Sequence, residues 1–231
     1  MPEEIVLTRE WLDSHFDLIK DLPARTIVHE VTPDVLAASI TTVNPDGVAT
    51  LLSLQALPQE HKEPDFVLAL DRLQDPGNLG TLLRTALAAE VDAVWLASGA
   101  DPLHPKVLRS SAGAILHVPY NRFGLSMDLA VQQLAEHLKN AAKAGKQIVA
   151  TVVPSSPSPH NLLPYWELDW LRPTVLLLGD EGSGLHPHLQ SCCTHVVTLP
   201  HSSLVESLNV AAVAVPLLLE RRRAKMTSVI C

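Results

Sequence analysis

Residues 68–85 read LALDRLQDPGNLGTLLRT, and this stretch indicates the fold of most of the chain. An apolar run suited to a buried strand passes through a turn with proline and glycine and enters a helical pattern. Residues 175–185, VLLLGDEGSGL, and residues 199–210, LPHSSLVESLNV, have the same character. Ligands of α/β sheets bind where strands end, so all three segments are candidate ligand-binding segments.

Around these segments, apolar runs alternate with helical patterns, which is typical of a parallel sheet with helices on both faces. The expected strands cover residues 66–70, 93–97, 115–119, 147–153, 174–179 and 195–199. The expected helices cover residues 79–90, 104–112, 127–144 and 208–225. Pro216 is expected to kink or shorten the last of them.

Polar residues at 59–64 separate two apolar patterns and predict a linker. We therefore expect a small α/β domain in residues 1–58 and a larger domain in residues 65–231. In the small domain, the expected strands cover residues 4–8, 26–30 and 48–54, and the expected helices cover residues 9–20 and 33–39.

Charge is distributed unevenly between these two parts. Residues 1–64 hold 11 acidic and 4 basic side chains, a net charge of −7, whereas residues 65–231 hold 14 and 13, a net charge of −1. Binding of RNA requires that phosphates be neutralised, so an acidic amino-terminal part is a poor docking surface by itself. Lys106 and Arg109, three residues apart, and the run at 221–225 with Arg223 are the candidate RNA-binding cations. The run also suits a solvated helix end.

Composition excludes some other classes of protein. With 231 residues, 47% of them hydrophobic, the chain can bury a sizeable core. No apolar run reaches the roughly 18 residues of a membrane span, and the first residues lack the basic start of a signal peptide, so we expect a soluble, cytoplasmic protein. The adjacent Cys192 and Cys193, near His195, match no usual zinc spacing, and we expect no metal.

Taken together and in this order, the three segments resemble the signature motifs of the SpoU (TrmH-type) RNA 2′-O-ribose methyltransferases of the SPOUT superfamily. The resemblance covers roughly residues 65–225 and includes residues 106–113, KVLRSSAG. It implies a deep trefoil knot, a rare exception to unknotted topology, whose loops hold S-adenosylmethionine. It also implies a homodimer, in which the arginine of the first motif acts beside the partner's cofactor site.

The last expected helix also favours a dimer, because its residues 208–219 are apolar around most of the circumference. A symmetric interface would cover such a helix on both copies, and burial by neighbouring helices of one chain is the alternative. The small domain resembles the second part of a ribosomal-protein-like domain used for substrate recognition. A basic strand and helix would precede residue 4, so either the domain is shortened or the chain begins inside a longer natural reading frame.

The resemblance assigns a cofactor loop to Gly179, Glu181 and Gly184, and it places Leu199 and Leu208 around the adenine. Glycine in such a loop lets backbone approach a ligand closely. An ordinary strand-to-helix turn is the alternative for this segment alone.

Catalytic roles are implied for Asn78, Arg84, Glu181, Ser207 and Asn209. The family gives the arginine the central role, sometimes as the base. Arginine stays protonated far above neutral pH, so orientation of the ribose and stabilisation of a developing alkoxide are easier roles for Arg84. An exposed helix cation is the alternative. Ser207 and Asn209 stand where the last helix should begin and could cap it.

Two departures from the family pattern leave every reactive group in place. Ser203 and Glu90 each stand where glycine is common. The glycine spacing of a dinucleotide-binding fold and the Gly-x-Ser-x-Gly of serine hydrolases are both missing from these segments. The expected function is methyl transfer from S-adenosylmethionine to a ribose 2′-hydroxyl in structured RNA, with ribosomal RNA the first choice and transfer RNA the second. A non-catalytic RNA-binding or assembly factor of the same fold is the alternative.

Overall fold

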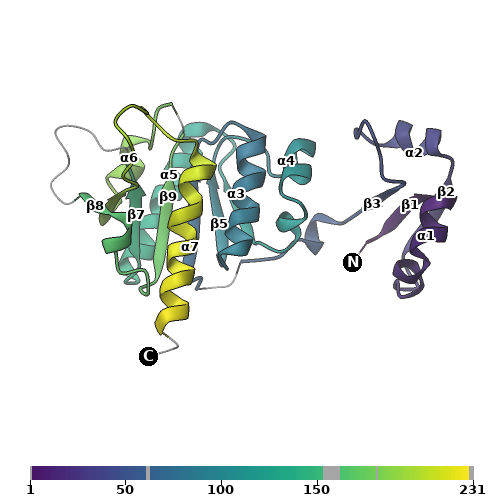
Figure 1. Ribbon diagram of the computed structural model, residues 1–231, viewed down its shortest axis with the longest axis horizontal. Helices are drawn as coiled ribbons and strands as arrows, with labels where there is room; N and C mark the ends of the chain where they lie inside the picture. The colour runs from purple at the N-terminus through teal and green to yellow at the C-terminus, as the bar shows by residue number, and fades with distance from the viewer. Residues whose placement is uncertain (1, 61–62, 153–161, 181, 229–231) are drawn as a thin grey trace. The chain divides into compact units, whose positions relative to one another are not determined.

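The computed structural model describes residues 2–60, 63–152, 162–180 and 182–228. The chain divides into two compact units, Met1–Leu57 and Pro58–Cys231 (Figure 1). The boundary precedes the expected linker, and Glu60 already belongs to the larger unit. There its carboxylate accepts hydrogen bonds from the indole of Trp95, at 3.0 Å, and from the side chain of Asn121.

The amino-terminal unit is a small α/β sheet in the strand order β2-β1-β3. Strand β1 is parallel to β2 and antiparallel to β3. Thr8 and Thr32 cap the two helices through their side-chain oxygens. In chain order the elements are β1 (Glu4–Thr8), α1 (Arg9–Lys20), β2 (Ile27–Val31), α2 (Pro33–Ser39), β3 (Val48–Leu51) and a 3₁₀ turn (Leu54–Ala56). The sequence predicted that the third strand would end at residue 54. It ends at Leu51, because a 3₁₀ turn begins at Leu54.

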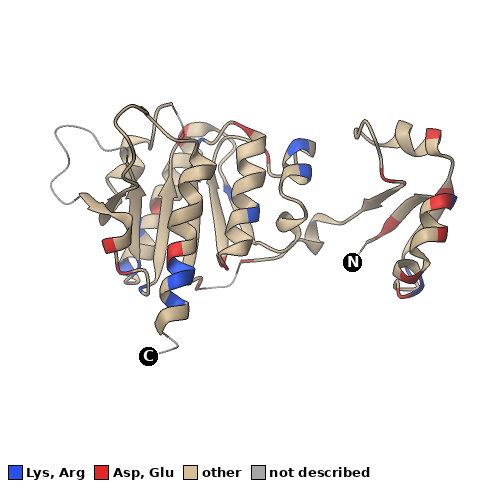
Figure 2. Cartoon of the chain, viewed as in Figure 1, with Lys and Arg blue, Asp and Glu red and all other residues tan. Residues whose placement is uncertain are grey.

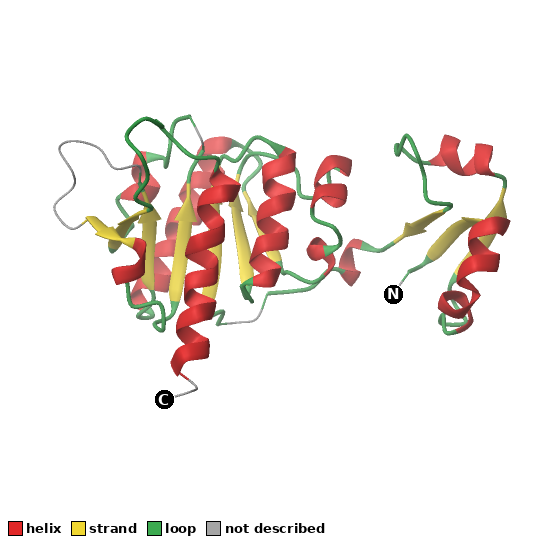
Figure 3. Cartoon of the chain, in the orientation of Figure 1, coloured by secondary structure: helices red, strands yellow, loops and turns green. Residues whose placement is uncertain are grey.

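The larger unit contains a seven-stranded, wholly parallel sheet in the order β6-β5-β4-β9-β7-β10-β8 (Figure 3). Its strands are β4 (Phe66–Asp71), β5 (Ala93–Ala97), β6 (Tyr120–Phe123), β7 (Gln147–Thr151), β8 (Leu162–Pro164), β9 (Thr174–Leu178) and β10 (His195–Thr198). Its helices are α3 (Pro76–Ala88), α4 (Pro105–Ser110), α5 (Met127–Lys143), α6 (Pro187–Gln190) and α7 (Val210–Ser228). The predicted parallel sheet is confirmed.

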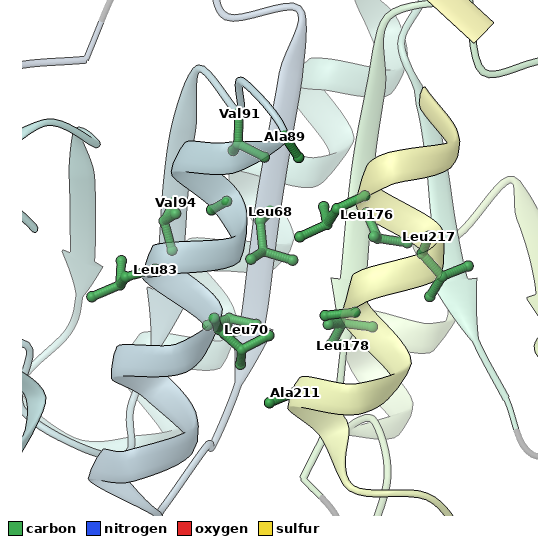
Figure 4. Close-up of a cluster of buried hydrophobic side chains, with 14 of the residues drawn as sticks. Leu68, Leu70, Leu83, Ala89, Val91, Val94, Leu176, Leu178, Ala211 and Leu217 are labelled. Carbon is green, nitrogen blue, oxygen red and sulfur yellow. The ribbon is translucent and has the colours of Figure 1, made fainter. Parts of the chain in front are cut away.

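Helices cover both faces of this sheet because successive residues of a strand point to opposite sides. On β4, Leu68 and Leu70 pack in the cluster that holds α3 and α7, whereas Val67 and Ala69 pack against α5. Figure 4 shows Leu68 and Leu70 beside Leu176 and Leu178 of β9, between α3 and α7. Such central strands are apolar on both faces, which is why they read as continuous apolar runs in the sequence.

One predicted strand is wrong. Residues 115–119 do not form a strand, although the Pro119 carbonyl accepts a hydrogen bond from the Val94 amide of β5 at 2.8 Å; instead, Gly113 turns with φ 83° into a 3₁₀ turn at Ala114–Leu116. This turn buries Ile115 in the cluster shared with α3, so the apolar residues serve packing rather than strand pairing. The strand begins at Tyr120 and lies at the edge of the sheet, with one neighbour.

Pro216 does not shorten the last helix, contrary to expectation, since α7 continues to Ser228. Proline removes a hydrogen bond to the carbonyl four residues earlier, here that of Ala212. Ala212 is exposed, so water can satisfy this carbonyl. Within the described ranges, none of the helices has both the length and the apolar character to cross a bilayer.

Candidate active site

A pocket of about 690 Å³ opens at the carboxyl ends of strands β7 and β9. Its walls come from the ends of β7 and β9 and from the segments that follow β9 and β10. The described lining residues include Thr151, Val152, Leu178, Gly179, Asp180, Gly182, Ser183, Gly184, Leu185, Leu199, His201, Glu206, Ser207, Leu208, Val210 and Val213. Its volume is typical of sites for small molecules and cofactors. The second and third motif segments thus form one pocket.

The loop after β9 folds back on itself, and this requires glycine at position 179. A Cβ at Gly179 would overlap the backbone of Gly184 and Leu185. The amide of Gly184 donates to the carbonyl of Asp180 at 2.9 Å, which closes the loop. Gly184 has φ +64°, a conformation that favours glycine, but the space beside its Cα is open. The close approach at Gly179 is thus to the loop's own backbone, and an approach of backbone to a ligand stays a prediction.

The carboxylate of Asp180 organises the turn. One oxygen accepts hydrogen bonds from the Ser183 amide at 3.1 Å, the Ser183 hydroxyl at 3.1 Å and the Gly182 amide at 3.2 Å. The Ser183 amide chiefly, with help from the nearby Arg72 cation, holds the pKa of Asp180 below its ordinary value. The carboxylate is therefore ionised at neutral pH. Glu181, for which the family resemblance implies both a cofactor and a catalytic role, lies outside the described residues.

The first and third motif segments meet through two asparagines. Asn209 caps α7, because its Oδ1 accepts from the amides of Ala211 at 2.9 Å and Ala212 at 3.3 Å. Its Nδ2 donates to Oδ1 of Asn78 at 3.1 Å. Asn78 lies in the first turn of α3, where its own amide donates to Asp75 at 2.8 Å. All three segments therefore converge, because Leu208 and Val210, on either side of Asn209, line the pocket.

The pocket wall contains most of the residues expected to hold the cofactor, namely Gly179, Gly184, Leu199 and Leu208. Ser207 and Glu206 lie in the same wall. Capping of the last helix was the alternative considered for Ser207 and Asn209. The helix α7 begins at Val210 and Asn209 caps it, whereas Ser207 lies in the pocket wall.

Arg84 lies apart from these residues. It is exposed on α3 and does not belong to the described lining of the pocket. It follows Asn78 by six residues, which at 3.6 residues per turn places it about 120° around the helix. Arg84 and Asn78 therefore project from different sides of α3.

The basic residues proposed for RNA differ in their surroundings (Figure 2). On α4, Lys106 lies 3.2 Å from Asp75, and Arg109 is exposed one turn further on. On α7, Arg223 forms a two-pronged ion pair with Glu220, with both Nε–O distances 3.0 Å. Its charge is thus already matched by a carboxylate. Lys106 likewise faces a carboxylate, whereas exposed Arg109 forms none of the ion pairs found among the described residues, so Arg109 is the better candidate for a phosphate contact.

The sequence suggested a cationic surface at residues 221–225. The structure shows that these residues do not form a uniform one. Arg221 is buried and donates to the carbonyls of Trp170 at 2.8 Å and Arg172 at 2.6 Å. Its guanidinium lies 4.6 Å from the ring centre of Phe66. Arg222 forms an ion pair with Glu90. The first half of the run therefore fastens α7 to the rest of the unit.

The two departures from the family pattern have ordinary structural solutions. Glu90 adopts φ 57°, the conformation in which glycine is common, and its carboxylate is held by Arg222. Ser203 is not among the non-glycine residues with positive φ, so its position does not require glycine.

The adjacent cysteines lie partly buried after α6. Burial chiefly raises the pKa of the Cys193 thiol to about 12, so this thiol stays protonated at neutral pH. No cluster of three or more His, Cys, Asp or Glu side chains suited to a metal ion occurs among the residues described.

Two residues that sequence reasoning missed lie at the end of β4. Asp71 is 1% exposed, and it accepts a hydrogen bond from the backbone amide of His186 at 2.7 Å. Arg72 reaches the carbonyl of Gly184 at 3.0 Å. The available signal was a carboxylate at the end of an otherwise apolar buried strand, which a fold tolerates only if the carboxylate has partners.

Comparison with known proteins agrees with this arrangement. The model of the SpoU rRNA methylase family matches residues 65–219. The chain belongs to the SpoU rRNA methylase family. A tRNA/rRNA methyltransferase of Synechocystis sp., described as uncharacterized, is 40% identical over 221 residues, which are 94% of this chain and 75% of the relative. A 23S rRNA (guanosine-2′-O)-methyltransferase of Bacillus subtilis is 31% identical and covers 84% of this chain and 72% of its own length.

A solved SpoU family structure shares the fold over nearly the whole chain. The SpoU methyltransferase AviRb of Streptomyces viridochromogenes, crystallised in complex with the cofactor AdoMet, superposes with a TM-score of 0.75 and 26% identity. The match covers 98% of this chain and 84% of that one. The family's cofactor is therefore S-adenosylmethionine.

Proposed function

We propose that this SpoU family chain transfers the methyl group of S-adenosylmethionine to the 2′-oxygen of a ribose in structured RNA. The observation that carries the proposal is the 3.1 Å hydrogen bond between Asn209 and Asn78. It joins the first and third motif segments beside a pocket that the second and third segments line. The Bacillus subtilis relative, named as a ribose 2′-O-methyltransferase of 23S rRNA, supports the same reaction.

The pocket fits the cofactor in size and in chemistry. Leu199, Leu208 and Val210 offer an apolar wall of the kind that an adenine requires. Gly179 and Gly184 bring backbone groups to the other wall. When bound there, S-adenosylmethionine supplies a methyl group on a positively charged sulfur, the electrophile of the reaction. The chain's own task is to hold the ribose in line with that methyl group.

Asn78 and Arg84 are the residues we assign to the RNA. A guanidinium binds a phosphate or ribose through two parallel hydrogen bonds and thereby fixes its orientation. Arginine keeps its proton at neutral pH, so Arg84 stabilises the developing negative charge on the 2′-oxygen rather than taking its proton. Asn78 offers an amide to the same substrate, held in place by Asn209.

We further propose that the active form is a homodimer in which Arg84 completes the site of the partner subunit. Two features support this assignment. Arg84 faces away from its own Asn78 by about 120° of helix rotation. In addition, α7 leaves Val215 and Leu219 each 40% exposed after burying its other face in the sheet cluster. A twofold interface would cover these apolar side chains on both copies at once.

The pocket loops are proposed to form the trefoil knot typical of this superfamily. Support comes from the segments after β9 and β10, for example Gly184 and Leu208, which line the same pocket although β7 lies between these two strands in the sheet. The amino-terminal residues 1–58 are proposed to take part in RNA recognition, with residues 59–64 as the connection. The amino-terminal unit is acidic and does not neutralise phosphates by itself. We assign the phosphate contacts to Lys106 and Arg109 of α4.

Ribosomal RNA is the proposed first substrate and transfer RNA the second, in the cytoplasm. To test this, the purified chain would be incubated with radiolabelled S-adenosylmethionine and with RNA from cells that lack its gene. We expect label in one 2′-O-methylated nucleoside of ribosomal RNA, identified by mass spectrometry. Cofactor binding by calorimetry with no transfer to any RNA would favour the non-catalytic alternative. No cofactor binding would reject the proposed function.

A further inference from the structure

Asp71 is a buried carboxylate at the last position of β4, and both of its oxygens have partners. Its side chain is fully buried, and Oδ2 accepts from the backbone amide of His186 at 2.7 Å. The Nε of Arg72 lies 3.2 Å from Oδ1 and 3.3 Å from Oδ2. Burial of an ionised carboxylate is unfavourable unless such partners are present. The position therefore serves something other than packing.

Arg72 joins this carboxylate to the cofactor loop. Its Nε contacts Asp71 while its Nη2 donates to the carbonyl oxygen of Gly184 at 3.0 Å. The backbone of Arg72 adopts φ 56°, which is uncommon for a residue with a side chain, and its amide donates to Ala97 at the end of β5 at 3.0 Å. The guanidinium is thus aimed at Gly184 by a turn fixed to the sheet.

Two backbone groups of the loop, at Gly184 and His186, are therefore tied to the end of the first motif strand. The residue between them, Leu185, lines the pocket. On the other side the same limb lies against Gly179, where a Cβ would not fit. Residues 184–186 are therefore held from two sides, by the end of β4 and by Gly179 after β9.

We propose that Asp71 and Arg72 are positioning residues that hold the wall at 184–186 in its cofactor-binding conformation. They act on the cofactor through the backbone of that wall and not by direct contact, because neither residue lines the described pocket. The inference rests on the proposed function, since it names what organises that function's cofactor site. Pre-organisation of this kind raises affinity by lowering the ordering that binding requires.

Two substitutions of Arg72 test the proposal, with calorimetric affinity for S-adenosylmethionine as the readout. Arg72→Ala removes both contacts, and we expect the dissociation constant to rise about tenfold or more. Arg72→Lys keeps a cation beside Asp71, which protects the fold, but one ammonium lacks the fork that reaches Gly184 as well. We expect an intermediate loss. The turnover at saturating cofactor should change less than about threefold, because the residues assigned to RNA are untouched.

Two control variants separate positioning from stability. Arg122 makes a matched pair of contacts at the edge of the sheet, with Asp101 at 3.5 Å and the Gly99 carbonyl at 3.4 Å, so Arg122→Ala should bind the cofactor normally. Ile115→Ala lowers the melting temperature through a core cavity in the cluster on the α3 face of the sheet, whereas Leu185 packs against the cluster on the α5 face, so this variant should also bind normally while folded.

Wild-type affinity in folded Arg72→Lys and Arg72→Ala would overturn the proposal. An equal loss of affinity in Ile115→Ala would overturn it too, since general destabilisation would then suffice. If Arg72→Ala does not fold, Arg72→Lys decides alone. Wild-type chain that fails to bind S-adenosylmethionine would reject the proposed function and this inference with it, whereas binding by wild type and loss only in the Arg72 variants supports both.

Discussion

The side-chain amide of Asn209 donates to Oδ1 of Asn78 at 3.1 Å, a contact between residues 131 positions apart in the sequence. The oxygen of the same amide caps α7. One side chain therefore starts the last helix and fastens it to the first turn of α3. The oxygen and the nitrogen of this amide are therefore expected to affect stability and methyl transfer separately.

Asn209→Ala should lower the free energy of unfolding by about 1 to 2 kcal/mol, because it removes a helix cap and an interhelical hydrogen bond. Asn209→Asp keeps the capping oxygen and loses the donor to Asn78, so it should retain most of the stability and lose methyl transfer. Urea denaturation and transfer assays measure the two effects. Ser126→Ala, which removes only the cap of α5, is the control and should stay active. Full activity of Asn209→Asp would contradict the assigned contact.

Arg84→Ala should abolish transfer while the affinity for S-adenosylmethionine stays within a few-fold, because Arg84 does not line the pocket of its own chain. Arg84→Lys should restore little, since a point charge lacks the planar fork of a guanidinium. Transfer to RNA and calorimetry are the measurements. Turnover close to that of the wild type in Arg84→Ala would remove Arg84 from the site.

A homodimer predicts sedimentation at twice the 25.0 kDa mass of one chain at micromolar concentration. Leu219→Glu, placed on the exposed stripe of α7, should shift the chain to a monomer and remove activity together. Mixing Arg84→Ala with the cofactor-site variant Gly179→Ala should restore part of the activity, because one mixed site then has both a working pocket and an arginine. A monomer that still transfers methyl groups would exclude the dimer.

Gly179→Ala and Gly184→Ala should differ in their effect on the cofactor. A methyl group at Gly179 overlaps the returning limb of the loop, so we expect loss of about 1 to 3 kcal/mol of stability and a large loss of affinity. At Gly184 the space is open, and the strain of a left-handed conformation costs about 1 to 2 kcal/mol. Calorimetry with both variants checks the order. Equal losses of affinity would mean that the backbone contact at Gly179 is not what shapes the pocket.

The lowered pKa of Asp180 predicts that this residue makes the stability of the folded chain depend on pH only at acidic pH. Its folded pKa lies below its ordinary value, chiefly through the Ser183 amide, so the folded chain binds this proton less readily than the unfolded chain. The resulting stabilisation is present above the unfolded pKa of an aspartate, roughly 4, and is lost as the pH falls through the folded pKa. The difference in unfolding free energy between wild type and Asp180→Asn should therefore narrow below about pH 4. A difference that stays constant there would contradict this origin.

Most of the fold followed from the sequence because parallel strands buried on both faces are continuous apolar runs. Strands β4, β5 and β9 agree with their predictions to within a residue at each end. Strand β6 was missed because it lies at an edge and is polar, while the apolar residues before it pack on α3. Strand β8 and helix α6, of three and four residues, are too short to show a period.

Site residues could be predicted from the sequence only where the identity of a side chain belongs to a recognisable motif. The sequence pointed to Asn78 and Asn209 separately as site residues, and their hydrogen bond is known only from the structure. Arg72 was invisible because its partner is the carbonyl of Gly184, 112 positions away, and every residue offers a carbonyl. Arg221 was misjudged for a similar reason: its partners are backbone carbonyls inside the unit.

The order of strands in the larger sheet has a consequence for biosynthesis. Strand β4 emerges early from the ribosome, yet one of its two neighbours is β9, and the pocket needs residues up to Val213. A nascent chain that ends before α7 lacks a wall of the pocket, so the cofactor cannot assist its folding. Contacts between segments so distant in sequence also form slowly. S-adenosylmethionine should therefore protect only finished chains from proteolysis, and it can serve as a reporter of completed folding in a translation reaction.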